Sequence, residues 1–288
     1  MQSNNPVFRR SAEFNGSRAN GTPTYAGGVG YGQPQGQPYG YGDPASWDMS
    51  RATAPAPASG RMTIDTVVQK TAFSVGTVIL AAMATWILTP DITTTNTDAM
   101  GALGALAGLG ALAAFGLSMV NSFKRLVSPA LVMAFAVAEG VALGALSKMF
   151  NGMFGGGVVM GAVIGTFAAF AGTLAAYKVL NIRVGDKFRI FVVAAMFGMV
   201  GLGLMELVLG LFGAQIGLFG FGGLGTVMAI VGLVLGVFML ILDFDFVEQG
   251  IAAGLDERES WRAAFAMTVS LVWIYTNLLR LLAIFSQD

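Results

Sequence analysis

The chain is 288 residues long, 55% hydrophobic and only 11% charged, with 16 basic and 16 acidic side chains and a formal net charge of zero. Soluble domains are about 25% charged, so this composition indicates a membrane protein, and the balanced charge gives no reason to expect nucleic-acid binding. Cysteine and histidine are both absent. Their absence excludes disulfides, thiolate metal sites and the commonest pH switch, so any proton chemistry must use carboxylates.

Residues 1–62 have the composition of a disordered segment, rich in Gly, Pro, Gln, Ser and Tyr and poor in aliphatic side chains. Such a segment buries too little apolar area to offset the entropy of ordering the chain. Its first residues also lack the apolar core of a cleavable signal peptide. We therefore predict a disordered tail over 1–62 and a membrane domain over 63–288, which opens with Thr63 as N-cap of an amphipathic lead-in.

Seven apolar segments are long enough to cross the hydrocarbon core of a bilayer, which takes about 20 residues of α-helix. They cover residues 72–89, 100–120, 129–150, 157–177, 190–213, 223–243 and 262–285. The segments are continuously apolar rather than alternating, which favours helices over a β-barrel. The prediction is an all-α membrane protein with a bundle of seven transmembrane helices. A count of six stays open, because the second segment is rich in Gly and Ala.

The distribution of Lys and Arg predicts the orientation, because these residues gather in cytoplasmic loops. With the N-terminus in the cytoplasm, every basic residue except Lys148 and Arg280 falls on a cytoplasmic segment. Seven spans then place the C-terminus outside. Glycines spaced by four, such as Gly140 with Gly144, recur along the spans and predict close helix packing inside the bundle.

Ionisable side chains inside the spans are informative, because each costs at least about 2.5–3.5 kcal/mol at the bilayer centre. Glu139 lies midway along the third span. It is either a neutral, hydrogen-bonded structural group or a functional acid. Glu206 in the fifth span and Arg280 in the seventh lie at similar depth. We predict that these two form an intramembrane ion pair, or that Arg280 extends outward to the interface.

Three carboxylates follow the sixth apolar segment in LVLGVFMLILDFDFVEQG, namely Asp243, Asp245 and Glu248. On a continuing helix, Asp243 and Asp245 point about 160° apart and cannot both face the bundle interior. Oxygen ligands at this density suit a hard cation, calcium above all, with Asp243 as the candidate ligand. The alternative is that the span ends at Asp243 and that the later acids are solvated at the cytoplasmic interface.

The sequence ILDFDFVEQGI, followed by SLVWIYTNLLRLL, resembles the last two spans of the Bax inhibitor-1/YccA family, the transmembrane Bax inhibitor motif family. MAFAVAEGVALGALS is similar to the third helix of that family. SNNPVFRR and MTIDTVVQKT resemble its larger bacterial branch, which carries a low-complexity N-terminal tail. The resemblance covers residues 63–287. It implies a bundle of seven helices with the last helix at the centre, and a pH-sensitive calcium leak as the activity.

In the mechanism that the resemblance implies, an aspartate of the sixth helix and one of the seventh share a proton and are latched by an arginine. The first aspartate matches Asp243, with Asp245 as second choice. The second falls on Ser270, so the pair of aspartates is absent. Asp245 or Glu139 is left to supply the other carboxylate. Arg125 lies a few residues beyond the position of the latching arginine.

Two functions are therefore open. The first is a leak for calcium or protons in the bacterial inner membrane, with Asp243 in the pathway and Asp245, Ser270 and Arg125 at a cytoplasmic gate. The second is a regulatory or scaffold membrane protein without transport, which binds membrane protein partners through its tail. An enzyme is the least supported class, because no cysteine, histidine or activated serine lies in the spans. We expect neither catalysis nor a cofactor.

Overall fold

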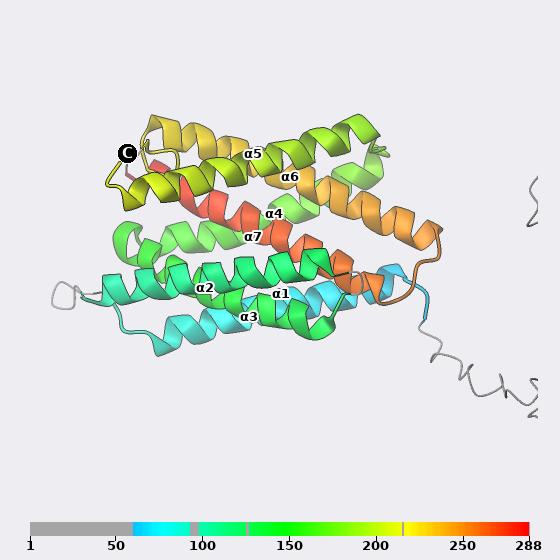
Figure 1. The fold of residues 1–288 in the computed structure, drawn as a ribbon, viewed down its shortest axis with the longest axis horizontal. Helices are drawn as coiled ribbons and strands as arrows, with labels where there is room; N and C mark the ends of the chain where they lie inside the picture. Colours follow the sequence, from blue (N-terminus) through cyan, green and yellow to red (C-terminus); the bar gives the residue numbers. More distant parts are fainter. Residues whose placement is uncertain (1–59, 93–97, 125–126, 215, 288) are drawn as a thin grey trace, which may run out of the picture. The chain divides into compact units, whose positions relative to one another are not determined.

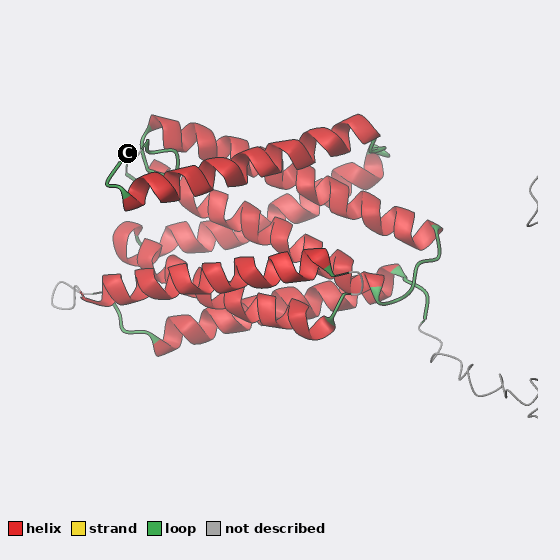
Figure 2. Ribbon diagram, in the orientation of Figure 1, coloured by secondary structure: helices red, strands yellow, loops and turns green. Residues whose placement is uncertain are grey.

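The computed structural model describes residues 60–92, 98–124, 127–214 and 216–287. Regular structure in these residues consists of helices and one isolated bridge (Figure 2). The helices are α1 (Ile64–Leu88), α2 (Asp98–Phe123), α3 (Pro129–Phe154), α4 (Gly156–Val179), α5 (Asp186–Leu211), α6 (Gly223–Ala252) and α7 (Glu259–Phe285). This order confirms the predicted bundle of seven helices. Residues 1–59 of the predicted tail lie outside the described residues, so disorder there stays a prediction. Its last residues are ordered, because Gly60 and Met62 form backbone hydrogen bonds to Glu257 and Leu255 and Met62 is buried.

Short connections join the helices, and consecutive helices run in opposite directions (Figure 1). One end of the bundle holds the start of α1 and the connections α2–α3, α4–α5 and α6–α7. We call it the α6–α7 end. The other end holds the connection α5–α6 and the end of α7, and we call it the α5–α6 end. All seven described helices are long and apolar enough to cross a membrane. The chain is therefore a multi-pass membrane protein.

The predicted start of the first helix is confirmed. Thr63 is the N-cap of α1, and it forms a reciprocal capping box with Thr66. Such a box satisfies two backbone N–H groups that would otherwise lack partners. The lead-in and the first span form one continuous helix. At α3, Ser128 is the N-cap and Pro129 follows it at the first helical position, where the missing N–H of proline is tolerated.

Helix α6 is longer than the apolar segment 223–243 from which the sixth span was predicted. Helix α6 continues past Asp243 to Ala252 and ends where Gly254 adopts a φ of 65°. The helix continues because Phe244 and Val247 extend its apolar face against the rest of the bundle. Gly254 tolerates the left-handed conformation that terminates a helix, which other residues rarely adopt. The carboxylates after Leu242 are thus all helical and do not mark the end of the helix.

Helix α7 is at the centre of the bundle, as the family resemblance implies. Within the described chain it packs against α1, α3, α4 and α6, whereas α2 contacts α3 alone and α5 contacts α6 alone. Its side chains Ala264, Ile274 and Leu279 are fully buried. The outer helices, by contrast, leave large apolar side chains such as Phe197 and Ile164 exposed. Such a surface is suited to lipid rather than water.

Glycines set the closest contacts between helices. A Cβ atom on Gly144 would lie 2.5 Å from the carbonyl oxygen of Ala82, and one on Gly140 would lie 2.5 Å from that of Val78, so α3 approaches the backbone of α1. On α6, Gly236 faces Ile274 of α7 in the same way. Hydrophobic association is weak in lipid, so such close packing supplies much of the attraction between helices. These positions confirm the predicted role of spaced glycines on α3 and α6, whereas Gly108 on α2, with nothing within 4 Å of its Cβ position, does not have that role.

Replacing Gly144 by Ala should destabilise the bundle, because the added methyl group overlaps the backbone of α1. Overpacking of this kind costs about 1–3 kcal/mol. The measurement is thermal unfolding of the purified protein in detergent, followed by tryptophan fluorescence. Gly108→Ala on α2 is the matched control, because a Cβ there has no neighbour within 4 Å. Equal midpoints for the two variants would contradict the packing role.

Candidate functional site

The side chain of Asp243, on α6, contacts Ser270 on the central helix α7. The Ser270 hydroxyl is buried and donates a hydrogen bond of 2.5 Å to Oδ2 of Asp243. The contact depends on the close approach of α6 and α7, in which Gly232 and Gly236 leave room for side chains of α7. The structure therefore brings together two residues that the sequence analysis selected. A hydroxyl stands where the family resemblance implies a second carboxylate.

Asp245 lies on another face of α6 and pairs with α5. Its Oδ2 accepts hydrogen bonds from Nη2 of Arg189 at 3.0 Å and from Nε2 of Gln249 at 2.7 Å. The side chain of Asp245 is only 9% exposed, whereas that of Arg189 is 47% exposed. The alternative of a solvated Asp245 is therefore wrong, because α6 continues and carries this residue against α5. Asp245 also does not supply a second carboxylate beside Ser270.

The side chain of Glu248 points in a third direction around α6, toward α4. It is exposed, and its Oε2 accepts a hydrogen bond of 2.7 Å from the hydroxyl of Tyr177 on α4. The three carboxylates thus have partners on three different helices: Ser270 on α7, Arg189 on α5 and Tyr177 on α4. Among the described residues no group of three acidic side chains converges as a metal site would require. Binding of a cation by Asp243 stays a prediction.

The other predicted members of the site lie elsewhere. Glu139 is on α3, and α3 does not contact α6 in the described chain. Glu139 is therefore not the second carboxylate beside Asp243. Arg125 lies outside the described residues, so its role as a latch stays a prediction.

Glu206 and Arg280 do not form the predicted ion pair. Glu206 accepts a hydrogen bond of 2.8 Å from the backbone N–H of Gly217, whereas Arg280 donates one of 2.9 Å to the carbonyl of Gly225. The guanidinium of Arg280 also lies 5.2 Å from the ring centre of Phe219. Both charged side chains thus hold the α5–α6 connection and its flanks. Similar depth in the membrane did not make them partners, because depth does not determine the direction in which a helical side chain points.

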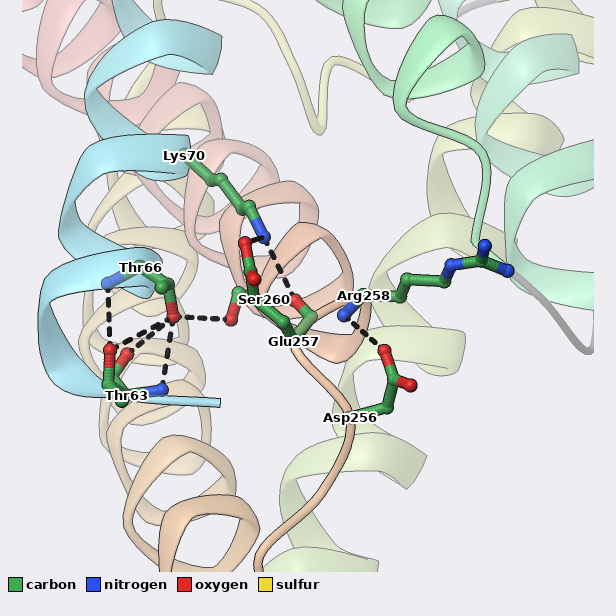
Figure 3. A network of polar contacts seen from close by, with 7 residues as sticks. All are labelled: Thr63, Thr66, Lys70, Asp256, Glu257, Arg258 and Ser260. Carbon is green, nitrogen blue, oxygen red and sulfur yellow. Dashed lines mark hydrogen bonds and ion pairs between the residues drawn. The ribbon is translucent and has the colours of Figure 1, made fainter. Parts of the chain in front are cut away.

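The α6–α7 connection is tied to the start of α1 (Figure 3). The Nζ atom of Lys70 donates to the backbone oxygen of Glu257 at 2.9 Å and forms an ion pair with its carboxylate at 2.8 Å. The hydroxyls of Thr66 and Ser260 lie 2.9 Å apart. The backbone N–H of Met62 also donates to the carbonyl oxygen of Leu255. These contacts hold the connection between the two helices that carry Asp243 and Ser270.

Arg189 and Tyr177 are partners that the sequence analysis missed. Both lie near the α6–α7 end, on helices that precede α6 in the chain. If the sequence analysis had predicted that α6 continues beyond Asp243, Arg189 in the first turn of α5 would have been at the right depth to pair with Asp245. The choice between Asp243 and Asp245 depends on helix rotation, which only the packing determines.

Comparison with known proteins agrees with this architecture. The family model described as Bax inhibitor 1 like matches residues 5–287, nearly the whole chain. No curated protein matches the sequence.

Replacing Arg189 by Met should destabilise the protein, because it leaves the carboxylate of Asp245 buried without its cation. An unsatisfied charged group of this kind costs about 1–3 kcal/mol or more. The measurement is the midpoint of thermal unfolding in detergent. Arg183→Met, at an exposed site of the α4–α5 connection, is the matched control. Asp245→Asn should cost less than Arg189→Met, because Arg189 is half exposed and water can solvate it. The reverse order would contradict this assignment.

Proposed function

Since the chain belongs to the Bax inhibitor 1 like family, we propose that it leaks calcium ions or protons across a bacterial inner membrane in a pH-dependent way. One observation carries the proposal. Asp243 is an acid on a membrane-spanning helix, it faces the central helix, and the hydrogen bond described for its side chain comes from a neutral hydroxyl. Asp245, two residues later, is neutralised by Arg189. Ionisable groups inside a membrane that lack a neutralising partner are functional by default.

Asp243 and Ser270 together suit a site that gains and loses a positive charge. A serine hydroxyl both donates and accepts hydrogen bonds. It can donate to the carboxylate of Asp243 and, after rotation, accept from the protonated acid. Carboxylate and hydroxyl oxygens are also ligands that a hard cation such as calcium accepts. The pair therefore accommodates a proton or a cation without a second aspartate, which distinguishes this chain from the mechanism that the family resemblance implies.

The depth of Asp243 fits a gate near one surface of the membrane. Ala252, the last residue of α6, is nine positions beyond Asp243, a distance of roughly 14 Å along the helix. The basic residues favour the α6–α7 end as the cytoplasmic one. Asp243 would then lie inside the cytoplasmic half of the bilayer, with the N-terminus in the cytoplasm and the C-terminus outside.

A second candidate function is a scaffold without transport, and one observation favours it. The backbone of Gly60 accepts a hydrogen bond from the N–H of Glu257, so the last residues of the predicted tail lie against the α6–α7 connection. A protein partner that binds the tail would thus act close to the site without any need for ion flow.

The two functions are separated by calcium flux into liposomes. Purified protein in liposomes that contain a calcium dye should admit calcium faster than empty liposomes do. Asp243→Asn should slow this entry at least about fivefold, since even in water the charge interaction is worth about 1 kcal/mol. Asp186→Asn, at an exposed acid in the first turn of α5, should leave the rate unchanged.

The same assay is to be run from about pH 5 to pH 8, the range in which a physiological switch must act. The rate for the wild-type protein should change with pH, and Asp243→Asn should remove most of that change. If the protein causes no calcium flux at any pH in this range, the result contradicts the leak and favours the scaffold function.

A further inference from the structure

A groove runs between α1 and α4 over the surface of α7. Both outer helices pack against α7, but they do not contact each other within the described chain. Two cavities of about 350 and 850 Å³ occupy the space between them. Val75, Phe167 and Leu271 line both cavities, so the two cavities are adjacent along α1, α4 and α7, and we call them together the groove. Because α1 and α4 are outer helices of a membrane protein, the groove opens sideways toward lipid.

The wall of this groove is apolar, and its hydroxyl groups already have partners. Ser147 and Tyr275 lie 2.6 Å apart and bond to each other. Thr166 donates to the carbonyl of its own helix at Ala162, and Thr268 donates to the hydroxyl of Ser74 on α1. Such a wall offers little to water or an ion, and it favours an apolar occupant. The groove is therefore distinct from the site at Asp243.

Charged side chains line only one end of the groove, near the α6–α7 end. Lys178 lies there at the end of α4, and Glu248 lies there on α6. The hydroxyl of Tyr177 donates a hydrogen bond to Oε2 of Glu248, so Oε1 can accept from a further donor. A cation and an anion that line the same end of the groove are complementary to a headgroup that carries a phosphate and an ammonium. From Lys178 to Val163, near the other end, α4 rises by about 22 Å, more than half of a ~30 Å hydrocarbon core.

We propose that the groove binds one acyl chain of a glycerophospholipid with a phosphoethanolamine headgroup. The acyl chain lies between α1 and α4 against α7, the phosphate meets Lys178, and the ammonium donates to Glu248. The apolar wall favours the hydrocarbon chain, and Lys178 and Glu248 favour the zwitterionic headgroup. The proposal stands independently of the ion leak.

Native mass spectrometry of the full-length protein, delipidated in detergent, tests this site. The probes are phosphatidylethanolamine, phosphatidylglycerol and phosphatidylcholine with identical acyl chains, added singly and in competition. Phosphatidylethanolamine should bind best, by about fivefold, the effect expected of one charge contact near the membrane surface. Phosphatidylcholine has no N–H donor for Glu248, and phosphatidylglycerol has no ammonium. Equal binding of all three lipids would overturn the headgroup assignment.

Two tryptophan variants on α4 test the acyl-chain site. Val163→Trp fills the groove, whereas Ile164→Trp, the next residue, is 61% exposed and does not line it. Val163→Trp should lose the bound lipid and Ile164→Trp should keep it. Equal retention by both variants would overturn the site.

Glu248→Ala keeps the proposal testable if Val163→Trp does not fold. Glu248 is exposed, so this variant should be stable. It removes the acceptor for the ammonium N–H and should lose the preference for phosphatidylethanolamine over phosphatidylcholine. A preference that survives in Glu248→Ala would overturn the proposal.

Discussion

The contact between α6 and α7 is the constraint on which the rest of the structure depends. Gly232 and Gly236 let the central helix approach α6 closely, and Trp273 reinforces the contact with a hydrogen bond of 2.8 Å from its indole N–H to the carbonyl of Gly232. The same approach brings Ser270 within hydrogen-bond distance of Asp243. In a membrane, where helices gain little from burying apolar surface, packing of this kind determines which polar groups meet.

Three neighbouring carboxylates illustrate how helix rotation separates groups that are close in sequence. Asp245 is neutralised by Arg189, and Glu248 is exposed and hydrogen-bonded to Tyr177. Asp243 faces the central helix with a hydroxyl as its hydrogen-bond donor. A carboxylate with a cationic partner is accounted for by that pair, whereas one without such a partner demands another explanation. That difference is the physical basis for proposing Asp243 as the functional acid.

Much of the fold could be predicted from the sequence, because each span is a local run of apolar residues with a length set by the bilayer. The site was only partly predictable. Asp243 emerged as an acid at the end of an apolar run and Ser270 from family resemblance, but Arg189 became visible as a partner only once α6 proved to continue beyond Leu242. Acids after an apolar run look like the end of a span, and no local signal reports a partner on another helix. The predicted ion pair of Glu206 and Arg280 was wrong for the same reason, because no local signal shows which partner on another helix a side chain contacts.

The central claim is that Asp243 is the acid that exchanges a proton. Infrared difference spectroscopy of the protein in lipid, recorded across a pH titration, measures this directly through the C=O band of a protonated carboxyl group. The account predicts a pH-dependent band that is lost in Asp243→Asn and kept in Asp186→Asn. A band that persists unchanged in Asp243→Asn would contradict the account.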